Sequence, residues 1–244
     1  MSSLAGTRRS IVKPVVLGIG AILLLIALLI GAWALWIMLR PAPAGFAPTS
    51  GQALTVVGQP PDVVQYTIDA RSRKEWVYFS FVHGTNVSTS QDALDWDLAF
   101  RRTDVLTNGG DTNPQGQAGA VDLERAPLNE AAAPSGGFLQ DMTHEDRGLE
   151  NPALHNWYNY DWTSHIITSK NHTYALRIST GEVVLLTFVS YYCDDGSPGC
   201  ITFRYRHIQD PDRTYSSGSR PLDSLVPQAR PEASPEAPEA SAGP

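Results

Sequence analysis

A pattern typical of calcium-binding loops occurs at Asp111-x-Asn113-x-Gln115-Gly116, with Asp122 at the twelfth position. Side-chain oxygens at positions 1, 3, 5 and 12, with a glycine at position 6, suit a hard cation such as Ca²⁺. However, position 5 is Gln, position 12 is Asp, and no helical pattern flanks the loop. A glycine-rich connection between strands accounts for the same residues, so the pattern does not favour a Ca²⁺ site.

Side chains able to ligate haem iron occur in two further stretches. Met142 and His144 lie in a polar segment, and His165 follows the aromatic-rich run from Trp157 to Trp162. Imidazole and thioether groups are axial ligands of haem iron, beside apolar walls that cover the macrocycle. The six histidines form no H-E-x-x-H motif and no pair with matching cysteine ligands, so a zinc site is unsupported.

No catalytic set is apparent. The chain has no G-x-S-x-G motif, and no glycine-rich nucleotide loop follows a strand and opens a helix. Asp95, Asp97 and Asp104 are the candidates for an acid/base pair. Strand alternation predicts that Asp95, Asp97 and Arg101 share the solvent side, which indicates a charged outer face. We therefore do not expect an enzyme.

The charge balance argues against binding to nucleic acid. The chain has 244 residues, with 18 Lys and Arg against 25 Asp and Glu. Three of the 18 basic residues and none of the acidic ones precede Arg40, which leaves 15 basic and 25 acidic residues from there on, a net charge of −10. Phosphate neutralisation needs a basic face.

The N-terminal region predicts a transmembrane helix. Val15 to Leu39 contains no charged residue, and about 25 residues at ~1.5 Å each exceed the ~30 Å hydrocarbon core. Basic residues precede the run (Arg8, Arg9 and Lys13), so the positive-inside rule places the N-terminus in the cytoplasm and the rest outside. A cleaved signal peptide is the alternative, although its apolar core spans only ~7–15 residues.

Composition divides the chain into five parts. We predict a cytoplasmic N-terminus (1–13), a transmembrane signal anchor (14–39), a Pro/Ala/Gly/Ser linker (40–53), one β domain (54–210) and a disordered Pro/Ala/Glu-rich tail (211–244). The domain shows alternating or aromatic stretches typical of strands at 76–81, 96–101, 174–178, 182–192 and 201–207. The segment 108–164 is rich in Gly, Pro and Asn and predicts loops with short strands.

Cys193 and Cys200 enclose the turn-rich sequence CDDGSPGC between the last two predicted strands. A disulfide closing this hairpin fits an oxidising compartment. Reduced buried thiols or a metal-binding pair are the alternatives.

One element resembles the signature of the HmuY-like haem-binding proteins. It runs from Trp96-Asp97-Leu98-Ala99-Phe100-Arg101 through Thr107-Asn108-Gly109-Gly110 into a glycine-rich stretch ending at Ala120. Further similar pieces are Asn156–Tyr160, Tyr174–Arg177, Tyr191-Tyr192 and Phe203–Tyr205. The resemblance covers most of 54–210. It implies an all-β, sandwich-like, extracytoplasmic and non-enzymatic bacterial domain, in which haem is held between two axial side chains.

The family's axial ligands do not map residue by residue onto this chain. Position and surroundings suggest His144 or Met142 together with His165, with His172 as a substitute. Trp157, Tyr158 and Trp162 would supply apolar walls. We thus expect a membrane-anchored haem-binding protein with haem, or a haem protein, as its partner. The alternative is an interaction or structural domain without a cofactor.

Overall fold

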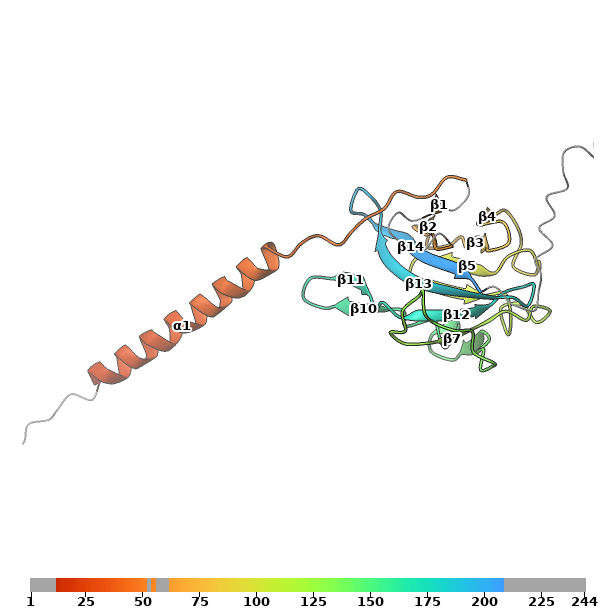
Figure 1. Cartoon of the computed structure of the whole chain (residues 1–244). Coiled ribbons are helices and arrows are strands. Elements are labelled where there is room, and N and C mark those ends of the chain that lie inside the picture. Colours follow the sequence, from red (N-terminus) through yellow and green to blue (C-terminus); the bar gives the residue numbers. More distant parts are fainter. Residues whose placement is uncertain (1–11, 52–53, 56–61, 209–244) are drawn as a thin grey trace, which may run out of the picture. The chain divides into compact units, whose positions relative to one another are not determined.

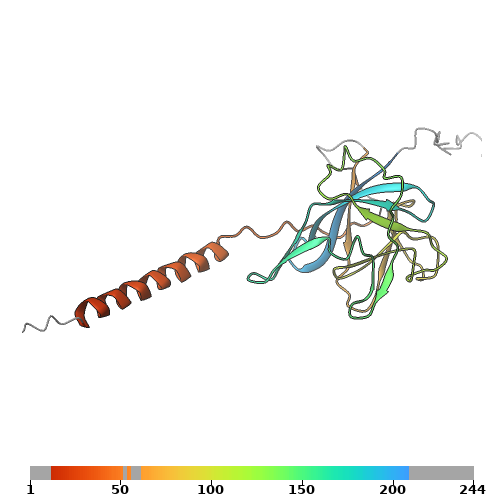
Figure 2. The ribbon, with the colours of Figure 1, turned by 90° about the horizontal axis from the view of Figure 1, so that it is seen from below.

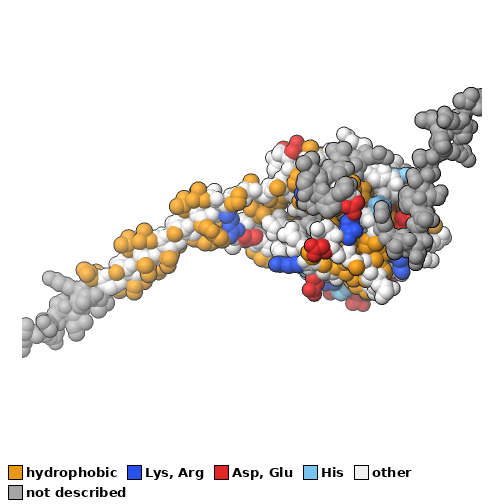
Figure 3. Space-filling view, in the orientation of Figure 1, with side chains coloured by type: hydrophobic (Ala, Val, Ile, Leu, Met, Phe, Trp, Pro, Cys, Tyr) orange, Lys and Arg blue, Asp and Glu red, His pale blue; other side chains and the backbone are white. Residues whose placement is uncertain are grey.

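The computed structural model describes residues 12–51, 54–55 and 62–208 (Figure 1). Residues 1–11 of the predicted N-terminus (1–13) and the whole predicted tail (211–244) lie outside the described residues, as do positions 52–53 of the predicted linker and 56–61 and 209–210 of the predicted domain. The first element is the helix α1 (Val12–Met38). Its residues 16–38 form a stretch that is long and apolar enough to cross a membrane. Hydrophobic side chains cover α1 in the space-filling view (Figure 3).

The rest of the described chain is built from antiparallel strands. One sheet has the order β1 (Leu54–Thr55), β2 (Val64–Asp69), β14 (Pro198–His207), β13 (Val183–Tyr192), β12 (Thr173–Arg177) and β7 (Gly119–Asp122). A second sheet has the order β4 (Thr85–Val87), β3 (Val77–Ser80), β5 (Leu98–Arg101) and β6 (Asp104–Thr107). Two ribbons complete the domain, β8 (Met142–His144) with β9 (Gly148–Glu150), and β10 (Tyr158–Asp161) with β11 (Ile166–Ser169).

Aromatic side chains join the two larger sheets into a sandwich. Phe203 of β14 lies 5.2 Å from Phe79 and 5.6 Å from Phe100, measured between ring centroids, and all three rings are buried. Tyr66 of β2 packs on Phe79 at 4.8 Å. Such contacts bury large apolar areas and favour offset or edge-to-face geometry. The all-β, sandwich-like fold expected from the sequence is therefore confirmed, and Figures 1 and 2 show its layers.

The strong strand patterns in the sequence correspond to β3, β5, β12, β13 and β14. The turn at Thr180-Gly181 joins β12 to β13, and Gly181 has a φ of 84°, which glycine adopts without steric cost. The predicted disulfide is also present, between Cys193 and Cys200. It joins the ends of β13 and β14, the longest strands described.

The prediction for Asp97 was wrong. It is 2% exposed and accepts hydrogen bonds from the backbone N–H of Phe81 (2.7 Å) and from the N–H and hydroxyl of Ser179 (2.8 and 2.7 Å). Because β5 begins only at Leu98, the alternation of the strand does not extend to Asp97. Its carboxylate instead ties the smaller sheet to the segment that follows β12.

The segment predicted as a linker lies against the domain. The Phe46 N–H donates to the Tyr192 carbonyl at 3.0 Å, and the Ser190 hydroxyl donates to the Ala44 carbonyl. Further on, the Thr49 N–H donates to the Thr67 carbonyl at 2.9 Å. Residues 44–49 are thus held beside the end of β13 and along β2.

Candidate functional site

The β8–β9 ribbon carries Met142 and His144. Met142 is 48% exposed, and His144 is half-buried beside the charged turn 145–147. The Asp146 N–H donates to the His144 Nδ1 at 3.5 Å, a long contact. The ribbon packs through β9 on β6 of the smaller sheet.

Charged groups gather at the end of this ribbon. Arg147 makes a two-pronged hydrogen bond to the Glu150 carboxylate, at 2.8 and 2.7 Å. This bond lowers the pKa of Glu150, and the charges of His155 and His144 add to the effect. The surroundings of His144 are therefore polar and charged.

A buried carboxylate holds the base of the β8–β9 ribbon. Asp141 is 3% exposed and accepts hydrogen bonds from the Thr107 N–H and hydroxyl, the Thr112 hydroxyl and the Asn151 amide, at 2.5–3.1 Å. Burial raises the pKa of Asp141, although its hydrogen bonds oppose the rise. The carboxylate links β6, the glycine-rich loop and the segment before β10.

The Gly109-Gly110 pair lets this loop pass close to its neighbours. A Cβ atom at Gly109 would collide with the Ala118 carbonyl, and one at Gly110 with the Asp141 carbonyl. Gly110 also has a φ of 62°. Both observations explain why the Thr-Asn-Gly-Gly sequence needs glycine here.

The β10–β11 ribbon carries His165 and Trp162. His165 has a φ of 57°, and its Nδ1 lies 2.5 Å from the Tyr160 hydroxyl. Trp162 is 81% exposed and contacts the Tyr160 ring edge-to-face at 4.8 Å. The ribbon packs through β11 on β13 and extends beyond the sheets in both views (Figures 1 and 2).

Of the aromatic residues proposed as haem walls, Trp157 lies in the core. It is 1% exposed, its indole N–H donates to the Thr103 carbonyl at 2.9 Å, and it packs on Phe188 at 4.6 Å. Its role is to fill the end of the sandwich. Tyr158 is half-buried and packs edge-to-face on Trp157.

His172, the substitute ligand, has a charged partner. Its Nδ1 lies 2.9 Å from an Asp122 carboxylate oxygen. This contact joins β7 to the residue preceding β12 and orients the imidazole.

The four residues of the calcium-like pattern have separate partners. Asp111 accepts from the Thr143 N–H at 2.7 Å, and Asp122 pairs with His172. Asn113 is buried, donates to the Ala93 carbonyl and to Asn108, and accepts from the Gln115 N–H. Within residues 12–51, 54–55 and 62–208, no group of three or more His, Cys, Asp or Glu could hold a metal ion.

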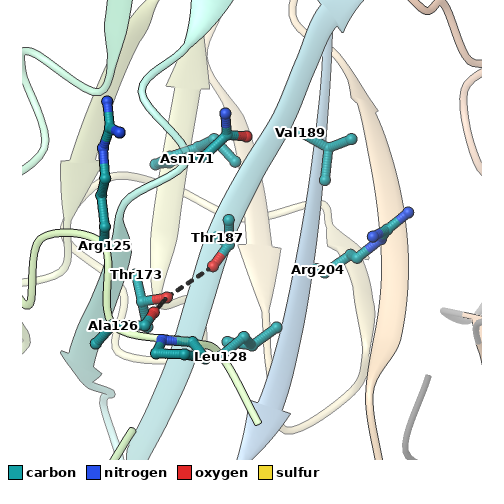
Figure 4. Close-up of a pocket in the computed structure, with 10 residues that line it drawn as sticks. Arg125, Ala126, Leu128, Asn171, Thr173, Thr187, Val189 and Arg204 are labelled. Carbon is teal, nitrogen blue, oxygen red and sulfur yellow. Dashed lines mark hydrogen bonds between the residues drawn. The ribbon is translucent and has the colours of Figure 1, made fainter. Parts of the chain in front are cut away.

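Two adjoining hollows lie on the six-stranded sheet, and no pattern in the sequence indicated them. One, of about 240 Å³, has Arg125 and Arg204 on opposite sides of β13, with a 3.1 Å Thr173–Thr187 hydrogen bond between them (Figure 4). The other, of about 190 Å³, shares Asn171 and Val189 with the first. Both are smaller than the ~300–1,000 Å³ of usual small-molecule sites. The guanidinium groups of Arg125 and Arg204 and the hydroxyls of Thr173 and Thr187 could bind a small anion.

The fold and the glycine-rich element agree with a family match. The model of the family described as HmuY protein matches residues 72–205, more than half of the chain, and the chain belongs to this family. No curated protein matches the chain by sequence.

Solved structures with a similar fold come from several bacteria. A candidate lipoprotein of Bacteroides fragilis NCTC 9343 has a TM-score of 0.51 and 22% identity, covering 67% of this chain and 100% of that one. A candidate HmuY-like haem-binding protein of Bacteroides vulgatus ATCC 8482 has a TM-score of 0.47 and 20% identity, covering 63% and 97%. The apo HmuY analogue of Tannerella forsythia has a TM-score of 0.48 and 16% identity, covering 59% and 95%. At these identities, the first structure supports the fold alone.

Proposed function

We propose that this chain is a haem-binding protein held at a membrane by α1, with its β domain on the extracytoplasmic side. The observation that carries the proposal is the family membership over residues 72–205, because haem binding is what the resemblance implies. The apolar length of α1 and the basic residues before it support the anchor and its orientation. The function is binding rather than catalysis.

The axial ligands we propose are His144, or Met142 beside it, and His165. Both histidines have Nδ1 next to a local hydrogen-bonding group, Asp146 N–H for one and Tyr160 hydroxyl for the other. An imidazole whose Nδ1–H donates to the Tyr160 hydroxyl is oriented by that bond and leaves Nε2 of His165 for the metal. At His144, Nδ1 instead accepts from the Asp146 N–H at 3.5 Å, so this weak contact would have to open before Nε2 could bind iron. The Tyr160 hydroxyl is the stronger of the two contacts, at 2.5 Å against 3.5 Å.

The residues that would hold the haem iron lie on two different ribbons. Since β9 packs on β6 and β11 packs on β13, the ligands come from opposite sheets of the sandwich. Tyr158 and Trp162 remain as possible walls, whereas Trp157 is committed to the core. His172 is the substitute ligand, oriented by Asp122.

The test is a haemin titration of the full chain in detergent, followed from the Soret to the Q bands. A saturable one-to-one change with six-coordinate low-spin bands is the expected result. His144→Ala and His165→Ala should each shift the Soret band or weaken binding. His83→Ala is the matched control, because His83 is exposed and lies on neither ribbon. Unchanged spectra in both ligand variants would discard the ligand assignment, and a non-saturating change would discard haem binding.

The second candidate is an interaction domain without a cofactor. The observation in its favour is that the two hollows are smaller than usual ligand sites and that Trp157 is already packed. A featureless haemin titration together with an intact fold is the result that would favour it.

A further inference from the structure

The end of α1 and the tip of the β10–β11 ribbon are joined by one ion pair. Arg40 lies two residues after the last helical residue, Met38, and its guanidinium contacts the Asp161 carboxylate at 2.5 Å. The same guanidinium lies 3.7 Å from the centre of the Trp36 ring. A charged side chain that follows an apolar span of this kind lies at the level of the lipid headgroups. Asp161 is therefore at headgroup level whenever α1 spans a bilayer.

The backbone sets an independent limit on this distance. The chain is held to β13 at Ala44, six residues after Met38, and six extended residues span at most ~20 Å. The β11 strand lies beside this attachment point, since the Ile167 N–H donates to the hydroxyl of Tyr192 on β13, at 2.9 Å, and Tyr192 also binds Phe46. The ribbon is thus on the part of the domain that the chain keeps closest to the end of α1.

The side chains at the tip of this ribbon suit a lipid interface. Trp162, next to Asp161, is 81% exposed, and Tyr160 is 36% exposed with its ring against Trp162. Indole and phenol rings favour the boundary between headgroups and acyl chains, because one end is apolar and the other is polar. The turn residues Trp162, Thr163 and Ser164 carry no charge, and Asp161 is already paired with Arg40.

The other ribbon provides the contrast within the same molecule. The β8–β9 turn contains Glu145, Asp146 and Arg147, which would each have to be desolvated to enter an interface. Trp33 and Trp36 lie near the C-terminal end of α1, the end that leads to the β domain, and are 52% and 55% exposed. Tyr160 and Trp162 would extend that pair into a broader aromatic belt.

From these observations, we propose that the tip of the β10–β11 ribbon docks into the interface of the bilayer that α1 crosses, with Trp162 as its main anchor. The contact would hold the domain in one orientation on the membrane. This proposal rests on the membrane anchor of the proposed function, but not on haem. When the tip is docked, Trp162 faces lipid and Tyr158 is the remaining aromatic wall for haem. Haem held by His165 would then be bound next to the lipid surface.

The experiment uses the full chain in phospholipid vesicles. An environment-sensitive fluorophore is attached at Thr163→Cys, which loses the hydroxyl bond to Asp161 but keeps the backbone N–H bond to it. In the matched control the fluorophore is attached at Glu145→Cys, in the turn of the other ribbon. Both positions are exposed, and the two native cysteines are joined in a disulfide, so the new thiol is the one available for labelling. Quenching is measured with nitroxide-headgroup lipids from the membrane side and with iodide from the water.

The expected result is strong lipid quenching and severalfold weaker iodide quenching at position 163 than at 145. Adding Trp162→Ala should reduce the lipid quenching at 163, and this variant should still fold because Trp162 is 81% exposed. Equal iodide quenching at both positions without lipid quenching would overturn the proposal. A chain that fails to float with the vesicles would overturn it as well. Protection of position 163 from iodide that depends on protein concentration would also overturn it, because it would indicate contact with a second copy of the chain. The quenching is read without haem, so a failed haemin titration leaves this result standing.

Discussion

The two ribbons both carry a histidine that could ligate haem, yet the molecule holds them in different ways. The base of β8–β9 is held by the buried Asp141 and its network of donors. The β10–β11 ribbon rests on β13 through the packing of Ile166 and Ile167 on the core and through separate hydrogen bonds, such as the one from the Ser169 hydroxyl to the Phe188 carbonyl at 2.7 Å. Polar groups that satisfy one another in a buried network are costly to remove, whereas a single, partly buried bond contributes less.

This difference suggests a division of roles. The β8–β9 ribbon would present its ligand from a rigid base and a charged turn. The β10–β11 ribbon is the one free to adjust, and its uncharged aromatic tip suits a lipid surface. A haem held by residues of both ribbons would then be bound on one side by the rigid β8–β9 ribbon and on the other by the adaptable β10–β11 ribbon.

The largest expected effect comes from removing the carboxylate at the base of β8–β9. Asp141→Ala leaves the Thr107 N–H, the Thr112 hydroxyl and the Asn151 amide without their acceptor in a buried place. We expect a loss of ~3 kcal/mol or more in the free energy of unfolding. Thermal and denaturant unfolding of the full chain in detergent measure it.

Ser169→Ala is the matched variant on the other ribbon. It removes the bond to the Phe188 carbonyl and the one accepted from the Asn171 N–H, and it should cost ~1 kcal/mol. Equal losses in the two variants would mean that the ribbons are held equally, which contradicts the comparison above.

A smaller change in the free energy of unfolding is expected from a change in pH. Burial raises the pKa of Asp141 above its ordinary value of 3.8. The folded state therefore holds this proton more tightly than the unfolded state, and the associated stability is fully present below pH 3.8 and is lost as pH rises through the raised pKa. The unfolding free energy of the native chain minus that of Asp141→Asn should fall as pH rises through this window.

The control for the pH experiment is Asp111→Asn, whose side chain is exposed and receives one hydrogen bond, from the Thr143 N–H. A difference curve for Asp141→Asn that stays flat, or that rises with pH, would show that the donors around the carboxylate outweigh its burial.

Local patterns predicted most of the framework but not the buried carboxylates. The strands β3, β5, β12, β13 and β14, the helix α1 and the Cys193–Cys200 bond each follow from residues near one another in the sequence. Asp97 and Asp141 depend on partners far along the chain, Ser179 at 82 residues and Thr107 at 34. No local period encodes such pairings, so Asp97 was placed on the wrong side and Asp141 was overlooked.

The candidate site was predictable only in part for the same reason. The histidines and Met142 could be found from residue type alone, and the structure places them on two ribbons. Their ring contacts to Tyr160, Asp146 and Asp122 were not foreseen. Residue type alone could not separate the two tryptophans of the aromatic run. Trp157 is buried in the core and Trp162 is exposed, although both belong to the same short stretch of sequence.

The smallest expected effect concerns what holds the tip of β10–β11. Asp161 accepts hydrogen bonds from the Thr163 N–H and hydroxyl and also pairs with Arg40, and these contacts lower its pKa, with the Thr163 hydroxyl as the largest cause. Asp161→Asn keeps an oxygen for Thr163 but loses the charge, whereas Asp161→Ala loses both. Since exposed ion pairs contribute little, we expect the Asn variant to resemble the native chain and the Ala variant to expose the turn.

Hydrogen exchange of the amides at 163–166 in the full chain distinguishes the two variants. Equal exposure in both variants would mean that the pairing with Arg40, and not the turn bond, holds the aromatic tip in place.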